Sequence, residues 1–221
     1  MNAPKALPKI ETAMEDLHAR IRACHYCFDR KDNRPVPGRG FARTGGLFLV
    51  GQAPGVREPA AQMNFAWTAG RRLFKWLATI GLPESMLRRH AYITAVTKCY
   101  PGKSKSGTGD RKPAPWEVEH CAPFLDEALK TLKPRVVVPI GGLAVERLLG
   151  EKSMSATIGN EYVKDLPGGE AFLIPLPHPS GASPWAHMPG NPEKLQKALQ
   201  LIRRRVRKEG LSDWFVDPSE S

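Results

Sequence analysis

The chain has 221 residues, of which 41% are hydrophobic, enough for one domain with a substantial core. Its 33 lysines and arginines against 22 acidic residues give a formal net charge of +11, which favours a polyanionic partner such as nucleic acid. We find no run of about 18 apolar residues and no apolar segment near the start, so we expect neither a membrane span nor a secretory signal. We therefore expect a monomer in the cytoplasm, associated with the nucleoid.

Apolar spacing predicts helices that alternate with short buried strands. The helices are expected over residues 11–23, 69–80, 116–132, 143–149 and 193–208. The strands are expected over residues 47–50, 91–97, 135–140 and 172–176. Alternation of this kind predicts an α/β fold in which a four-stranded parallel sheet is sandwiched between helices, in three αβα layers. We expect a single domain over residues 1–221, with the first helix and a pair of cysteines within residues 11–30 and a flexible tail from residue 210.

Unusual loop sequences follow each predicted strand. Residues 51–55 (GQAPG) follow the first strand, residues 98–99 the second, residues 141–142 (GG) the third and residues 178–180 (HPS) the fourth. The carboxyl ends of parallel strands meet at one edge of the sheet, and ligands bind there. The sequence therefore predicts a functional site at this edge.

Four cysteines form a candidate metal site. Cys24 and Cys27 make a C-x-x-C unit after the first helix, Cys99 ends the second strand and Cys121 lies in the helix that follows. A set of soft thiolates suits zinc or an iron–sulfur cluster, and the long loop between Cys99 and Cys121 favours a cluster. A redox C-x-x-C with two bystanders, or four free thiols, are the alternatives.

Several motifs together resemble the uracil-DNA glycosylase superfamily. They are GQAPG, NFAWTAG over residues 64–70, AYITAVTKC over residues 91–99, Cys121 and the HPS of residues 178–180. The similarity covers about residues 20–205 and is best to members that carry a [4Fe–4S] cluster. It implies a [4Fe–4S] cluster on the four cysteines, with zinc as the alternative. It also implies hydrolysis of the N-glycosidic bond of uracil in DNA during base excision repair.

The resemblance also implies roles for residues at the predicted edge. His178 would donate a hydrogen bond to uracil O2 and stabilise the leaving base, and Phe65 would stack on the flipped base. A loop histidine and a core phenylalanine are the alternatives. Glu58 would position water or stabilise the cationic sugar; a surface carboxylate paired with Arg57 or Arg71 is the alternative. The residues expected to wall the pocket are Gly51, Gln52, Ala53, Pro54, Gly55, Asn64 and Ser180.

Two alanines depart from the family pattern. Ala53 stands where several branches carry an acidic residue or an asparagine that orients water. Ala95 stands where the iron–sulfur branch carries an asparagine that reads the uracil edge. Because a site without such groups discriminates weakly, we predict a substrate range that includes other deaminated bases. A catalytically weak DNA-binding or abasic-site-binding protein on the same fold is the alternative.

Basic and loop residues predict a DNA-binding surface. The basic loop over residues 100–115 has no histidine, which argues against the covalent capture of abasic sugars known in a related branch. The loop after His178 is expected to enter the minor groove, where Trp185 would be its apolar tip or would pack beneath it. The last helix carries Arg203, Arg204 and Arg207, which either contact phosphates or form a solvated face. The residues expected to contact DNA are Lys103, Lys105, Arg111, Lys112, Ser183 and Trp185.

Overall fold

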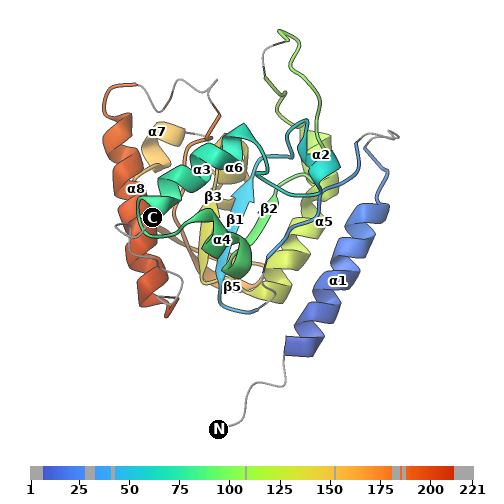
Figure 1. Ribbon diagram of the computed structural model, residues 1–221, viewed down its shortest axis with the longest axis horizontal. Helices are drawn as coiled ribbons and strands as arrows, with labels where there is room; N and C mark the ends of the chain where they lie inside the picture. The colour runs from blue at the N-terminus through green and yellow to red at the C-terminus, as the bar shows by residue number, and fades with distance from the viewer. Residues whose placement is uncertain are drawn as a thin grey trace.

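The computed structural model describes residues 7–27, 33–40, 43–107, 109–151, 153–180, 185 and 188–211. It contains a five-stranded sheet with helices on both faces (Figure 1). The strands are β1 (Leu47–Gly51), β2 (Tyr92–Ala95), β3 (Val136–Pro139), β4 (Tyr162–Leu166) and β5 (Gly169–Leu173). The helices are α1 (Leu7–Ala23), α2 (Glu58–Ala61), α3 (Thr68–Ala78), α4 (Glu84–His90), α5 (Pro115–Leu132), α6 (Gly142–Leu149), α7 (Met154–Thr157) and α8 (Asn191–Lys208).

The sheet has the strand order β2-β1-β3-β5-β4. The first four of these strands are mutually parallel, and Phe48 of β1 lies opposite Tyr92 of β2 and Val137 of β3. These are the four parallel strands that the sequence predicts, with their ends shifted by a few residues. The fifth strand, β4, corrects the prediction: it pairs antiparallel with β5 as an edge hairpin. The sequence of β4 is YVKDL, in which only the two end residues are half-buried and the central three are exposed. It therefore contains no buried apolar run by which it could be recognised.

Alternate residues of the strands pack against two separate sets of helices. Leu47 and Leu49 of β1 point to the face covered by α3, α4 and α8. Phe48 and Val50 point to the opposite face, covered by α1, α5 and α6. The predicted αβα layering is therefore confirmed, and Figure 1 shows α1 lying beside α5 on the outside of its layer.

The five predicted helices are present as α1, α3, α5, α6 and α8, each within a few residues of its expected bounds. The prediction missed α2, α4 and α7, which have four, seven and four residues and are too short for a period of 3.6 residues to emerge. Among the described helices, none combines the length and apolar character needed to cross a membrane.

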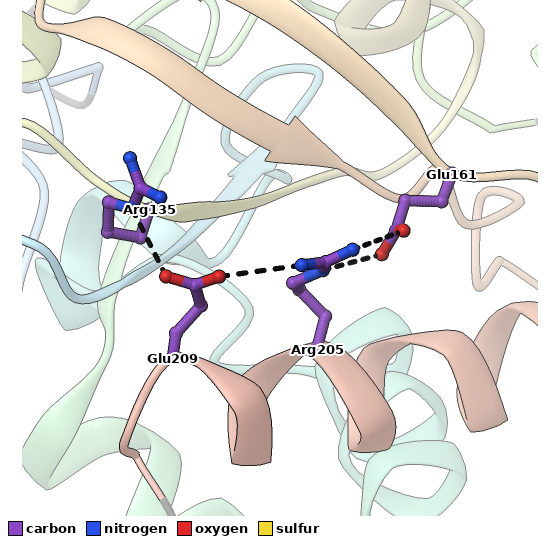
Figure 2. A network of polar contacts seen from close by, with 4 residues as sticks. All are labelled: Arg135, Glu161, Arg205 and Glu209. Atoms are coloured by element: carbon purple, nitrogen blue, oxygen red, sulfur yellow. Dashed lines mark hydrogen bonds and ion pairs between the residues drawn. The ribbon is translucent and has the colours of Figure 1, made fainter.

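A polar network ties α8 to the hairpin edge of the sheet (Figure 2). Arg205 donates two hydrogen bonds to the Glu161 carboxylate, at 2.9 and 2.6 Å, and its guanidinium lies 3.5 Å from the ring centroid of Phe172. The carboxylate of Glu209 forms ion pairs with the guanidinium groups of Arg205, at 3.5 Å, and Arg135, at 3.1 Å. The network thus links the end of α8 to the segments that precede β3 and β4.

Candidate active site

A cavity of about 520 Å³ opens at the carboxyl ends of the parallel strands. Its wall comes from the loops after β1, β2 and β5 and from the start of α3, so the predicted residues 52–55 and 178–180 meet here, whereas residues 98–99 and 141–142 do not line the cavity. The predicted residues that line the cavity are Gln52, Ala53, Pro54, Gly55, Glu58, Lys112, His178 and Ser180. The sequence prediction missed Trp67, Pro101 and Asp110, which also line it.

His178 follows β5 and presents a neutral imidazole to this cavity. Burial lowers the pKa of His178, and the charge of Asp110 opposes this effect only in part. The backbone N–H of Ser180 donates to Nδ1 of His178 at 3.2 Å, so the ring proton is on Nε2. The ring packs closely on Gly141, where a methyl group would lie 3.0 Å from Cδ2 of His178. His178 is therefore a neutral hydrogen-bond donor whose ring is kept in place by its contacts with Ser180 and Gly141.

Glu58 begins α2 and is buried beneath the cavity wall, with 6% of its surface exposed. Burial raises the pKa of Glu58 to about 7, while hydrogen bonds from backbone amides and the charge of Arg88 pull it down. The expected alternative, a surface carboxylate paired with Arg57 or Arg71, does not describe this burial. Arg57 and Arg71 lie over the ring of Trp67 instead, at 4.2 and 5.3 Å from its centroid.

Phe65 lies beside the cavity in a fixed backbone conformation. Its φ of 56° is in the left-handed region, and its ring packs so closely on Gly51 that a methyl group there would be 2.7 Å from Cζ. Arg88 donates to the carbonyls of Asn64 and Phe65, at 3.2 and 2.9 Å. Phe65 is 8% exposed and belongs to the core. Its stacking on a base stays a prediction.

Asn64 and Ala95, at the two positions considered for reading a base edge, do not line the cavity. Asn64 is buried and donates to the carbonyl of Pro37 at 2.9 Å, while its Oδ1 has no hydrogen-bond partner among the described residues. Ala95 is buried at the end of β2, and its carbonyl accepts a hydrogen bond from Nζ of Lys98. The backbone at Ala95 is therefore already engaged from inside the protein.

The four cysteines converge where the segment after α1, the end of β2 and α5 meet. Cys27, Cys99 and Cys121 line one small cavity, and Cys24 lies close enough to affect the pKa of all three. Burial, and after it the neighbouring thiols, raises the pKa of Cys27 to about 11 and that of Cys99 to about 12. Among the described residues, no three Cys, His, Asp or Glu side chains stand ready to hold a metal ion. The donor set is nevertheless the soft one that zinc or an iron–sulfur cluster uses.

Comparison with known proteins agrees with this geometry. Residues 37–203 match the profile of the Uracil DNA glycosylase superfamily. The chain belongs to this superfamily. It is 29% identical to the Type-4 uracil-DNA glycosylase of Pyrobaculum aerophilum, covering 94% of this chain and 99% of the relative. It is 31% identical to the Type-4 uracil-DNA glycosylase of Archaeoglobus fulgidus, over 76% of this chain and 82% of the relative. A Type-5 uracil-DNA glycosylase of Pyrobaculum aerophilum is 33% identical over 56% of this chain and 55% of the relative.

In this superfamily member, the basic loop after β2 contains cations that form ion pairs and cations that form none among the described residues. Arg111 binds Glu117 through two contacts of 2.6 Å, and Lys112 pairs with Glu146 at 2.9 Å. Lys103 and Lys105 are exposed. Phosphate contacts by all four remain a prediction, and Lys103 and Lys105 can make them without breaking an ion pair within the described part of the chain.

The loop after His178 is described only in part. Ser183 lies outside the described residues. The indole N–H of Trp185 donates to Oγ of Ser155 at 3.2 Å, and the side chain is partly buried against the core. Its backbone carbonyl accepts from Asn191 at 2.8 Å. Trp185 is therefore packed against the core, and its contact with DNA stays a prediction.

Proposed function

We propose that this chain is a monofunctional DNA glycosylase that hydrolyses the bond between uracil and deoxyribose in DNA, as a step of base excision repair. The observation that carries the proposal is the neutral Nε2–H of His178 in a cavity that Glu58 also lines. Membership of the superfamily and the names of the Type-4 relatives support it.

His178 supplies the donor that this reaction needs. When the bond to the sugar breaks, negative charge develops on an oxygen of the leaving base, and a donor already held in place stabilises that charge without reorganisation. Because Nδ1 of His178 accepts from the backbone N–H of Ser180, the neutral imidazole keeps its proton on Nε2 and can donate there. The target nucleotide must leave the stack to reach the cavity, as for other enzymes that act on bases.

Glu58 supplies negative charge on the sugar side of the reaction. As the base leaves, positive charge develops on the sugar, and a carboxylate in the wall of a desolvated cavity stabilises it or positions water beside it. Because burial raises the pKa of Glu58 to about 7, this role should strengthen as the pH rises through neutrality.

The substrate range is proposed to extend beyond uracil. Ala53 lines the cavity and Ala95 is buried, and neither side chain can form a hydrogen bond with a base edge. Sites that lack such groups reject non-cognate substrates weakly. Hypoxanthine and xanthine in DNA are the further substrates to test.

The four converging cysteines support a bound [4Fe–4S] cluster, with zinc as the alternative. Cys24, Cys27, Cys99 and Cys121 would hold it and would tie the segment after α1 to the loop after β2. Hydrolysis of the glycosidic bond transfers no electrons to or from the protein, so the cluster would serve to hold these segments together.

The partner is proposed to be DNA that contains uracil or another deaminated base. The net charge of +11 and the exposed lysines of the loop after β2 favour attraction to phosphates. We propose that the chain acts as a monomer, in the cytoplasm and at the nucleoid.

A panel of oligonucleotides tests the proposal directly. Single-stranded and double-stranded substrates would carry uracil, hypoxanthine, xanthine or a thymine mismatch, and alkali would reveal the abasic product. We expect release of uracil by the wild type and loss of release in H178A, with DNA binding retained. A wild type that binds these oligonucleotides but releases no base would instead support a non-catalytic binding protein.

A further inference from the structure

An acidic residue lies in the otherwise basic loop after β2. Asp110 pairs with Lys103 through an isolated antiparallel bridge, which folds the loop back on itself. The turn brings Asp110 to the wall of the cavity that contains His178 and Glu58. A carboxylate repels the phosphates of DNA, so Asp110 does not contribute to phosphate binding as its basic neighbours can. We therefore looked for a different role for this side chain.

Asp110 and Glu58 approach the same point of the cavity wall. A methyl group on Gly55 would lie 3.7 Å from Oδ2 of Asp110 and 3.9 Å from Oε1 of Glu58. Two carboxylate oxygens thus lie within 4 Å of one point beside Gly55. Gly55 has no side chain to fill that space, which leaves room for a small reactant between the carboxylates.

The charge of Asp110 acts on the groups around it. It raises the pKa of His178 against the larger effect of burial, which requires the two side chains to be close. Burial, and after it the charge of Asp110, raises the pKa of Tyr100. Asp110 is itself exposed and open to water, whereas Glu58 is buried.

We propose that Asp110 is a catalytic carboxylate that orients and deprotonates the attacking water, while Glu58 stabilises the cationic sugar. The proposal rests on the glycosylase function proposed above. The bond between the sugar C1′ and the base nitrogen breaks, and its electron pair leaves with the base. The water oxygen forms the new bond to C1′, and the water proton passes to Asp110 and then to solvent. The base anion takes up a proton from solvent, which completes the hydrolysis.

Asp110 thereby fills the role that Ala53 leaves vacant. Ala53 lines the same cavity but carries no group that can bind water. Asp110 enters from the loop after β2, a different part of the chain that contributes to the same wall. A carboxylate within reach of water beside the reacting carbon is the geometry of general base catalysis.

Single-turnover excision of uracil from a single-stranded oligonucleotide tests this role, in the full-length chain with its cofactor. The variants are D110N, D110A and D110E, and D165N is the matched control because Asp165 is an exposed aspartate on β4. Loss of a general base predicts a fall in rate of roughly 10²-fold or more for D110N and D110A. D110E should recover part of the rate, and D165N should match the wild type. Circular dichroism melting would establish that each variant is folded.

DNA binding, measured by fluorescence anisotropy, separates catalysis from electrostatics. Removing a negative charge from a loop that faces DNA should leave binding unchanged or tighten it, so a slower D110N must owe its defect to the chemical step. An active wild type with an unchanged D110N rate would overturn the role of Asp110 alone. A wild type that releases no uracil would overturn the proposed function, and this inference with it.

Discussion

The backbone N–H of Ser180 donates a hydrogen bond to Nδ1 of His178, and this bond fixes the proton of the imidazole on Nε2. The amide of a glutamine at position 178 can reach the place of Nε2, whereas that of an asparagine reaches only the place of Nδ1. We therefore expect H178Q to excise uracil faster than H178N. Loss of one such donor costs about 10²–10³-fold in related sites, which sets the expected fall for H178N. Single-turnover rates measure the difference, and equal rates for the two variants would contradict the tautomer assignment.

Glu58 should give uracil excision its pH dependence. Burial raises the pKa of Glu58 to about 7, so the carboxylate form predominates only above that pH. We expect the wild-type single-turnover rate to rise with pH up to about 7 and then to level off. E58Q should be slower and should lose this rise, since glutamine does not titrate. An E58Q profile that keeps the same inflection would assign the inflection to another group.

The same residue should link stability to pH. The folded-state pKa of Glu58 is raised from 4.5 to about 7, so its stabilising contribution is complete below 4.5 and is lost as the pH rises through 7. E58Q cannot acquire the buried charge and should unfold at a higher denaturant concentration than the wild type at pH 8. The difference should be at most roughly 3 kcal/mol and should shrink towards pH 4.5. A variant that is less stable than the wild type at pH 8 would contradict this.

The fold could be predicted where burial leaves a clear pattern. Three of the four parallel strands, β1, β2 and β3, are buried at every residue, and such strands are recognised from short apolar runs such as residues 47–50. The edge strand β4 was missed because its central residues Val163, Lys164 and Asp165 are exposed, so alternation and burial do not mark it. The one-turn helices α2 and α7 depend on the loops that hold them rather than on a period of their own.

The candidate site could be predicted where motifs follow the strands, and His178 and residues 52–55 do line the cavity. Asp110 was missed because it lies in a loop whose composition predicts a phosphate-binding surface, and the sequence does not show the bridge to Lys103 that folds this loop towards the cavity wall. Phe65 shows the opposite case. The motif predicts its role, but the structure places its ring against Gly51 outside the cavity lining.

The converging cysteines predict a defined response to removing one thiol. When purified without air, the wild type should contain iron and acid-labile sulfide and should be brown. C99S and C121S, purified in the same way, should contain less of both and should lose the brown absorbance. Because the cluster would join the segment after α1 to the loop after β2, both variants should also melt earlier. Wild-type protein that contains zinc and no iron would contradict the cluster and support the alternative.

Trp67 predicts a DNA contact at the cavity rim. Trp67 is 44% exposed, and the guanidinium of Arg57 lies 4.2 Å from the centroid of its ring. Exposed aromatic rings among cations stack on unpaired bases, and loss of such a stack costs about 1–3 kcal/mol. We expect W67A to weaken binding of single-stranded DNA and W67F to retain most of it, by fluorescence anisotropy. W116A is the control, because Trp116 is also exposed but does not line the cavity; equal losses in W67A and W116A would contradict the assignment.

Arg205 is predicted to stabilise the fold without contributing to excision. Its two hydrogen bonds to Glu161 hold α8 against the segment that precedes β4, and both side chains are largely buried, at 15% and 17% exposure. R205M would remove the positive charge and the hydrogen bonds that stabilise the partly buried carboxylates of Glu161 and Glu209. We therefore expect a loss of about 2 kcal/mol in the free energy of unfolding at pH 7. R204M, which replaces an exposed arginine on the same helix, should lose far less stability.

The contribution of Arg205 should also depend on pH. The hydrogen bonds from Arg205 lower the pKa of Glu161, so their contribution to stability is present above the ordinary pKa of 4.5 and is lost as the pH falls through the lowered value. The difference between R205M and the wild type should therefore narrow in acid, and a difference that stays constant down to that range would show that the lost packing of the arginine on Phe172, rather than the ion pair, destabilises the variant.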